Sequence, residues 1–255
     1  MPSSFSKIND PIQKFLALQR NNIAKIKKPH WVKLFSDALF CGEDLVRNKK
    51  FFQAIKQSLK QIPNPSTVVD AGSGSGILGI FALYLGAKKC YFLEQNPYSL
   101  KMNQKLCHLL GYQKQAIFIP GDAKKQILPE KYNLLISETI SSGFVREDFP
   151  AIINNLKKYG EKNSIIIPEN FVIQIIEKDI NDQYLAKHQL QFSSQKDFKK
   201  QTIKLKNKNT YFLEFITTAC LFDNIYITPG SCLSFLNNIK INLNFSHPLF
   251  KFIIS

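Results

Sequence analysis

The middle of the chain alternates short apolar runs with longer segments in which apolar residues recur at helical spacing. The apolar runs are residues 68–69, 90–93, 116–119 and 132–136, and the helical segments are residues 77–85, 97–110 and 148–156. This alternation predicts parallel strands joined by helices, which is an α/β fold. We place this domain at residues 63–168, because Pro63 and Pro65 end the preceding helix and favour an extended chain.

Different patterns flank this domain on each side. Residues 1–30 carry a weak helical pattern that predicts one or two loosely docked helices, and residues 44–59 carry a clear helical stripe. We assign residues 1–62 to an amino-terminal helical segment. Beyond the α/β domain, short β-rich runs alternate with turns, which predicts a small antiparallel β domain over residues 169–255. Within it, residues 181–190 are the one segment whose pattern favours a helix.

The segment ahead of the first strand carries two features with alternative readings. Trp31, Phe35 and Phe40 either close over a ligand or only anchor the segment to the core. Arg47 lies in the first turn of the helix predicted over residues 44–59. There it pairs with the carboxylate of a ligand or remains an ordinary surface residue.

The most informative stretch is TVVDAGSGSGILGIFALYLGAKKCYFLE, from Thr67 to Glu94. It contains a strand that ends in Asp70, a loop with three alternate glycines, a helix, and a second strand that ends in Glu94. This is a parallel βαβ unit with a ligand loop at its first turn. A dinucleotide loop requires glycine at position 77, where this chain has Ile77.

The two acids indicate which ligand the loop binds. Asp70 would repel a pyrophosphate and suits a cationic amino group, and Glu94 is placed to accept hydrogen bonds from two ribose hydroxyls. With a glycine backbone that permits close approach, this combination describes S-adenosylmethionine (SAM) as the cofactor, rather than a glycine-rich turn of another α/β protein. The predicted cofactor-binding residues of this stretch are Asp70, Gly72, Ser73, Gly74, Gly76, Glu94 and Gln95.

Two loops after later strands add further candidates. In a SAM-binding fold the loop after the third strand holds the adenine, so we assign Asp122 and Ala123 to that role. Glu138 ends the fourth strand, and Glu147 follows nine positions later. Two carboxylates that face one pocket form a clamp for a planar cation such as guanidinium, and we predict both as catalytic residues. The alternative for Glu147 is a first-turn acid of the next helix.

Composition limits the possible classes of function. The hydrophobic fraction of 44% is typical of a globular protein, and no apolar run approaches the roughly 18 residues of a membrane span. The apolar run near the start is too short for a secretory signal. The net charge of +15 suits nucleic acid or acidic partners, and equally a solvated lysine surface. Five scattered cysteines without a C-x-x-C pair predict a cytoplasmic protein with no metal site.

These features together resemble the protein arginine methyltransferases, a class I SAM-dependent family, and their small prokaryotic relatives. The D-x-x-R motif of that family stands here as Asp44-Leu45-Val46-Arg47, and its strand-S-E segment as PEKYNLLISE, ending at Glu138. Its paired glutamates are nine apart, as Glu138 and Glu147 are, and Pro168 matches a proline after the fifth strand. The resemblance implies a Rossmann-like SAM-binding domain, a following barrel-like β domain, Arg47 as the partner of the SAM carboxylate, and methyl transfer to an arginine of a protein.

The chain also departs from that family. It has no Thr-His-Trp loop, because Trp31 is its only tryptophan, and its β domain is too short for a dimerisation arm. Cys41 stands where the family has a methionine near the sulfonium. Two alternative functions therefore remain: methyl transfer to RNA or to a small metabolite, and SAM binding without catalysis. The sequence leaves the oligomeric state open.

Overall fold

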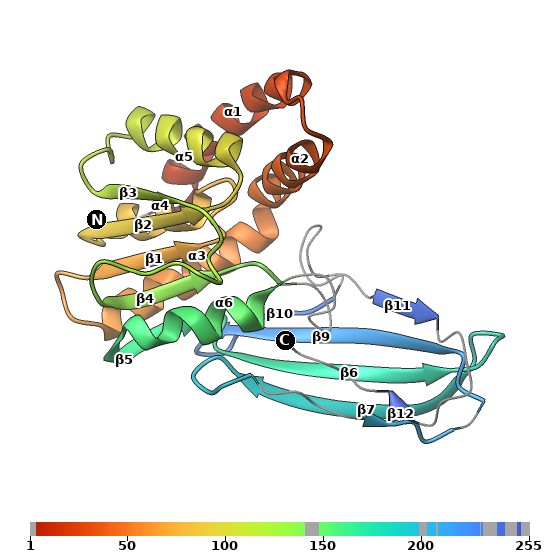
Figure 1. Cartoon of the computed structure of the whole chain (residues 1–255). Coiled ribbons are helices and arrows are strands. Elements are labelled where there is room, and N and C mark those ends of the chain that lie inside the picture. Colours follow the sequence, from red (N-terminus) through yellow and green to blue (C-terminus); the bar gives the residue numbers. More distant parts are fainter. Residues whose placement is uncertain are drawn as a thin grey trace.

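The computed structural model describes residues 4–140, 148–198, 203–207, 209–229, 231, 239–242 and 249–250. Within them the chain forms amino-terminal helices, a parallel sheet flanked by helices, and an antiparallel sheet that extends to one side (Figure 1). Glu147, the second predicted catalytic glutamate, lies outside the described residues. No helix of the described ranges is long and apolar enough to cross a membrane.

The amino-terminal helices pack closely on the rest of the chain. These elements are α1 (Phe5–Gln19), η1 (Arg20–Lys25), α2 (Pro29–Glu43) and α3 (Leu45–Gln61). Ile12 and Leu16, one turn apart on α1, are fully buried. The ring of Phe5 makes edge contacts with Phe52 of α3 and Phe81 of α4 (Ile77–Tyr84), with ring centroids 5.4 and 5.7 Å apart. The prediction of loose docking is therefore wrong, because α1 buries a continuous apolar stripe.

The parallel sheet has the order β3-β2-β1-β4-β5, with every strand pairing parallel. Its strands are β1 (Thr67–Ala71), β2 (Lys89–Glu94), β3 (Ala116–Pro120), β4 (Tyr132–Ser137) and β5 (Gly160–Ile167), and its other helices are α5 (Pro97–Leu109), α6 (Phe149–Leu156) and η3 (Lys157–Tyr159). Val68 and Val69, which face opposite sides of central β1, are both fully buried because helices cover both faces. The predicted α/β fold is confirmed.

Local sequence signals set the starts of two helices near the sheet edge. The Asp44 carboxylate accepts a hydrogen bond from the Arg47 backbone N–H at 3.1 Å and caps α3. Asn96 caps α5 in the same way through the N–H of Tyr98, and Pro97 occupies the first position of that helix. Both caps follow short connections, so they fix where the helices begin relative to the sheet.

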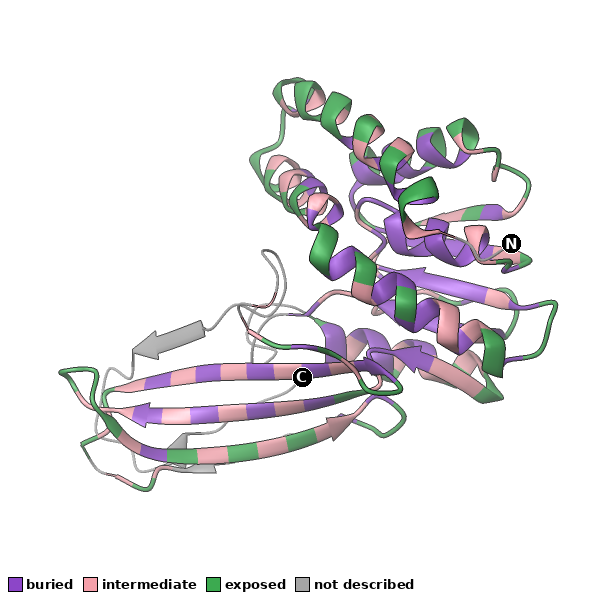
Figure 2. Ribbon diagram, turned by 180° about the vertical axis from the view of Figure 1, so that it is seen from behind, coloured by how far each residue is buried: buried purple, intermediate pink, exposed green. Residues whose placement is uncertain are grey.

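The second sheet is antiparallel, in the order β10-β9-β6-β7, with β11 also paired to β9. Its strands are β6 (Asn170–Lys178), β7 (Tyr184–Ser193), β9 (Phe212–Phe222), β10 (Ile225–Ile227) and β11 (Ile239–Asn242); β8 (Ile203–Lys204) pairs separately with β12 (Leu249–Phe250). Burial alternates along β6 and β9, as the striped colouring in Figure 2 shows. The helix predicted at residues 181–190 is wrong, because most of that segment belongs to β7 and hydrogen-bonds to β6.

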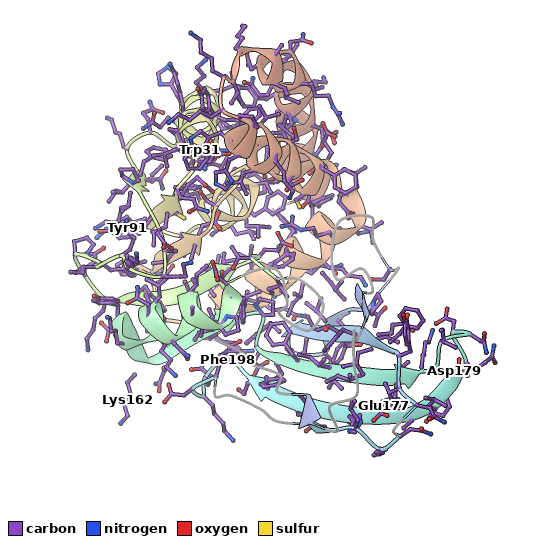
Figure 3. All side chains as sticks on the ribbon, turned by 45° about the vertical axis from the view of Figure 1, so that its right-hand side comes forward. Trp31, Tyr91, Lys162, Glu177, Asp179 and Phe198 are labelled. Atoms are coloured by element: carbon purple, nitrogen blue, oxygen red, sulfur yellow. The ribbon has the colours of Figure 1, made fainter. Side chains whose placement is uncertain are left out.

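Contacts from helices α6 and α3 join the α/β domain to the antiparallel sheet. The ring of Phe149, at the start of α6, lies 5.1 Å from that of Phe171 on β6 and 5.7 Å from that of Phe198. On α3, the Lys50 ammonium donates to the Tyr226 carbonyl of β10 at 2.8 Å. Figure 3 shows Phe198 at this junction, between Trp31 among the amino-terminal helices and Glu177 at the far end of the β domain. Helices α3 and α6 therefore belong structurally to both halves.

Candidate functional site

The glycine loop after β1 folds tightly against β2. The backbone N–H groups of Gly72 and Ser73 both donate to the Leu93 carbonyl, at 2.9 and 3.0 Å. Gly72 has a φ of +70°, and a Cβ atom there would lie 2.3 Å from the Thr139 Cγ2 atom. A larger residue at this position would therefore combine an unfavourable backbone conformation with a steric clash.

A cleft of about 270 Å³ lies beside this loop, at the carboxyl ends of β1, β2 and β4. All but one of the predicted cofactor residues line it, together with predicted catalytic Glu138: Arg47, Asp70, Gly72, Ser73, Gly74, Glu94, Gln95, Asp122, Ala123 and Glu138. The exception is Gly76, which immediately precedes α4 in the left-handed conformation and packs against Asn103. The parallel sheet brings these residues together because its strands end at one edge.

Glu94 is buried at the end of β2 and is fixed by backbone donors. One carboxylate oxygen accepts from the Gly74 N–H and the other from the Asn96 N–H, each at 2.7 Å. Burial raises the pKa of Glu94, and these hydrogen bonds oppose the shift. The carboxylate thus couples the glycine loop to the start of α5, and it lines the cleft where a ribose acceptor is predicted.

Asp70 at the end of β1 is only 2% exposed. Its Oδ2 atom accepts a hydrogen bond from the Gly79 N–H of α4 at 2.8 Å. Burial raises the pKa of Asp70 to about 7, although this hydrogen bond and the charge of Arg47 favour the ionised form. Asp70 therefore has a structural role in holding α4, beyond the predicted interaction with an amino group.

Arg47 and Glu138 form an ion pair within the cleft. The Nη2 atom of Arg47 lies 2.7 Å from Oε2 of Glu138, and the two side chains are 4% and 12% exposed. Burial raises the pKa of Glu138, and the charge of Arg47 opposes that shift. The sequence predicts two different ligand groups for these residues, whereas the structure brings the two side chains into direct contact.

Helix α2 covers one side of the cleft through residues that are not among the predicted cofactor-binding residues. Leu34, Asp37 and Ala38 line it, whereas the three aromatic residues of this segment do not. Phe35 is buried in the core, Phe40 is exposed, and Trp31 packs against the core. Anchoring is thus the correct alternative for Phe35 and Trp31. The helical spacing of positions 34, 38 and 41 is a signal from which the lining face was predictable.

Of two further acids, Asp148 lies in the cleft and Glu177 lies far from it. Asp148, just before α6, lines the cleft and pairs with Lys124 at 2.6 Å. Glu177, by contrast, is fully buried at the far end of the β domain (Figure 3), where His188 contacts it at 2.5 Å. Burial tends to raise the pKa of Glu177, but its hydrogen bonds from Lys206, Thr210 and other donors lower it overall. No cluster of metal-ligating side chains occurs among the described residues.

The cleft residues fit SAM as a cofactor. The close-packed glycine loop leaves backbone beside the cleft where side chains would fill it. Buried Asp70 and Glu94 offer carboxylates for an amino group and for ribose hydroxyls. The Nε atom of buried Arg47 has no hydrogen-bond partner among the described residues, which leaves a donor for a carboxylate.

Comparisons with known proteins agree with this chemistry. A family model described as ribosomal protein L11 methyltransferase (PrmA) matches residues 52–191, which are 140 of the 255 residues. The histone-arginine methyltransferase CARMER of Drosophila persimilis is 29% identical over 126 residues, covering 49% of this chain and 23% of that protein. The arginine N-methyltransferase PRMT10 of Arabidopsis thaliana is 29% identical over 133 residues, covering 50% of this chain and 33% of that protein.

The fold has a solved counterpart. It is the PRMT1 enzyme–prozyme heterotetrameric complex of Trypanosoma brucei with AdoHcy, at 12% identity and a TM-score of 0.57, covering 78% of this chain and 81% of that one. The matches to the two curated relatives span about a quarter to a third of their lengths. The fold, the cofactor and the resemblance to arginine methyltransferases are thereby confirmed. The chain belongs to the ribosomal protein L11 methyltransferase (PrmA) family, has the fold of a class I SAM-dependent methyltransferase, and is similar at modest identity to the arginine methyltransferases.

Proposed function

We propose that this methyltransferase acts on a nitrogen of a protein side chain, with the guanidinium group of arginine as the acceptor. The observation that carries this proposal is the charge of the cleft. Among the residues that the structure describes, six carboxylates line it, those of Asp37, Asp70, Glu94, Asp122, Glu138 and Asp148, and Arg47 is the cation of the lining. With Lys33, which pairs with Asp37, and Lys124, which pairs with Asp122 and Asp148, the formal charge is 3 − 6 = −3, in a chain whose net charge is +15.

This segregation of charge favours cationic ligands. SAM supplies a methyl group on a positively charged sulfonium when it is bound. A cationic acceptor is attracted by the same carboxylates, whereas a phosphate backbone is repelled from the cleft. The basic exterior remains favourable for acidic regions of a partner that lie outside the cleft.

Glu138 is the residue that we assign to the acceptor. Arg47 holds its Oε2 atom, which fixes the carboxylate at the end of β4. We assign the Oε1 atom to the acceptor nitrogen, where it would orient the nucleophile and favour loss of its proton. Glu147 remains our proposed second glutamate of the clamp.

The related proteins support a protein substrate. The description of the family names ribosomal protein L11, and that of the related CARMER names histone arginine. Both descriptions name proteins as the methyl acceptors. The free thiols of Cys41, Cys90, Cys107 and Cys220 further support our proposal of a reducing, cytoplasmic location.

The test is transfer of labelled methyl groups from SAM to a lysate, followed by separate nuclease and protease digestion. We expect label that resists nuclease, is released by protease, and is recovered as methylated arginine after hydrolysis. Glu138→Gln should abolish this transfer while SAM binding stays within a few-fold. The matched control is Glu130→Gln, since Glu130 pairs with Lys89 near the amino-terminal ends of the strands. Full activity of Glu138→Gln contradicts the assignment.

The net charge of +15 favours a second candidate, an RNA acceptor bound by exposed lysines. Label that is lost to nuclease and retained after protease treatment supports this candidate. Label in neither polymer, but in the small-molecule fraction, identifies a metabolite as acceptor. SAM binding without transfer to any fraction supports a non-catalytic module.

A further inference from the structure

Asn48 is a fully buried polar residue next to Arg47 in the first turns of α3. Its Nδ2 atom donates to the Gly42 carbonyl, and its Oδ1 atom accepts from the Nη1 atom of Arg47, each at 2.7 Å. Asparagine is a poor residue for a helix interior, and burial of its amide is unfavourable without partners. The two hydrogen bonds therefore explain how this residue is tolerated here.

The chemistry of this position selects an amide side chain. The carbonyl of Gly42 presents an acceptor and the guanidinium of Arg47 presents a donor, and an amide side chain complements both. The orientation of the amide follows from the same partners, since a flipped group would oppose two donors and two acceptors. Leucine supplies neither hydrogen bond, and aspartate supplies only the acceptor at neutral pH.

The same Gly42 carbonyl is held from the other side by α1. The Nε2 atom of Gln13 donates to it at 2.8 Å. A Cβ atom at Gly42 would lie 2.8 Å from Leu16 and 2.9 Å from Ser75, so α1, the α2–α3 junction and the glycine loop meet here without free space. Asn48 connects this rigid junction to Arg47, whose Nη2 atom reaches Glu138.

We propose that Asn48 is a positioning residue that fixes the Arg47 guanidinium for both the cofactor carboxylate and Glu138. The inference rests on the proposed roles of Arg47 and Glu138 in SAM binding and methyl transfer. Four contacts define the guanidinium position: Nη1 to Asn48 at 2.7 Å and to the Cys41 carbonyl at 3.4 Å, Nη2 to Glu138, and the face of the Phe51 ring with its centroid 5.0 Å away. Without Asn48, the guanidinium keeps only the longer hydrogen bond to the Cys41 carbonyl as its tie to the α2–α3 junction.

The test compares two ligands that differ in the group Arg47 is proposed to bind. S-adenosylhomocysteine carries the amino-acid arm, and 5′-methylthioadenosine lacks it while keeping the adenosine. We expect Asn48→Leu to weaken S-adenosylhomocysteine by about ten-fold in calorimetry, the scale of one lost charge-assisted hydrogen bond. Binding of 5′-methylthioadenosine should stay within about two-fold. Equal weakening of both ligands indicates a merely structural role and overturns the proposal.

Two further variants separate the bonds of Asn48. Asn48→Asp keeps the acceptor for Arg47 and loses the donor to Gly42, so the ratio of the two dissociation constants should stay within about three-fold of wild type. Gln13→Leu removes the other donor to Gly42 without contact to Arg47, so it should lower the melting temperature and leave the ratio unchanged. The ratio is the dissociation constant of 5′-methylthioadenosine divided by that of S-adenosylhomocysteine. If it falls in Asn48→Asp as far as in Asn48→Leu, or if it changes in Gln13→Leu, the proposal is overturned. If wild type binds neither ligand, the cofactor assignment itself fails.

Discussion

The guanidinium of Arg47 lies 2.7 Å from the carboxylate of Glu138 and connects the first turn of α3 to the end of β4. Arginine keeps its charge under all ordinary conditions, whereas burial alone would shift Glu138 toward its neutral form. The charge of Arg47 therefore favours the ionised form of Glu138 that an acceptor nitrogen needs.

Removal of Arg47 should destabilise the protein, because it leaves the buried carboxylate of Glu138 without a charge partner. We expect Arg47→Met to lower the free energy of unfolding by about 3 kcal/mol at pH 8, because Glu138 loses its partner. Without Arg47 the pKa of Glu138 rises further, so the deficit should shrink as the pH falls and Glu138 takes up a proton. Urea unfolding of the wild type and of Arg47→Met at pH 5 and pH 8 measures this difference in the free energy of unfolding. A deficit that is the same at both pH values contradicts the coupling.

Asp70 should make cofactor binding depend on pH. Its pKa of about 7 means that much of the protein carries a neutral Asp70 near pH 6. A cationic amino group binds the ionised form better, so SAM affinity should increase as the pH rises through 7, by at most ten-fold per pH unit. Calorimetry in buffers of different ionisation enthalpy should detect release of a proton on binding. Asp70→Asn should flatten this profile, and a persistent slope in that variant would assign it to another group.

The raised pKa of Asp70 has the opposite effect on the folding stability of the ligand-free protein, which should decrease as the pH rises. A buried acid with a raised pKa is most favourable when protonated, so ionisation of Asp70 reduces folding stability. Its contribution to the free energy of unfolding should therefore fall as the pH rises from about 4 to about 7 and level off above that. Asp70→Asn should lack this component.

Glu94 should be required for both the loop and the cofactor. We expect Glu94→Gln to weaken SAM binding by about ten- to a hundred-fold, because an amide replaces one carboxylate oxygen that accepts from the Gly74 or Asn96 N–H. Glu130→Gln removes an acid that pairs with Lys89, outside the lining of the cleft, and should leave affinity unchanged. Comparable affinities for the two variants would exclude the predicted role of Glu94.

Gly72 should tolerate alanine less than another glycine of similar backbone conformation. Gly111 has a φ of +80° and nothing within 4 Å of an added Cβ atom, so Gly111→Ala should cost about 1 kcal/mol of stability. Gly72→Ala adds a clash with Thr139 Cγ2 and should cost roughly 1–3 kcal/mol more.

Thr139→Ser provides the matched rescue, since it removes the Cγ2 atom. The double variant Gly72→Ala/Thr139→Ser should recover most of the additional loss in thermal unfolding. Additive effects of the two substitutions would show that the close approach does not limit the loop.

The sequence by itself determined the features that depend on local order along the chain. The strand–loop–helix–strand unit from Thr67 to Glu94, the caps at Asp44 and Asn96, and the acids at strand ends all follow from short-range pattern and chemistry. Because parallel strands end at one edge of a sheet, these local signals also predicted that the residues at their ends would meet at one cleft.

Only the tertiary structure decided the features that depend on contacts between distant segments. Residues 181–190 have a helical pattern, yet pairing with β6 makes most of them part of a strand, because neighbouring strands satisfy the backbone better than an isolated turn. The Arg47–Glu138 pair likewise joins two segments far apart along the chain, whose approach no local spacing encodes. The sequence thus specified which groups can bind the cofactor, and packing decided which of them hold one another in place.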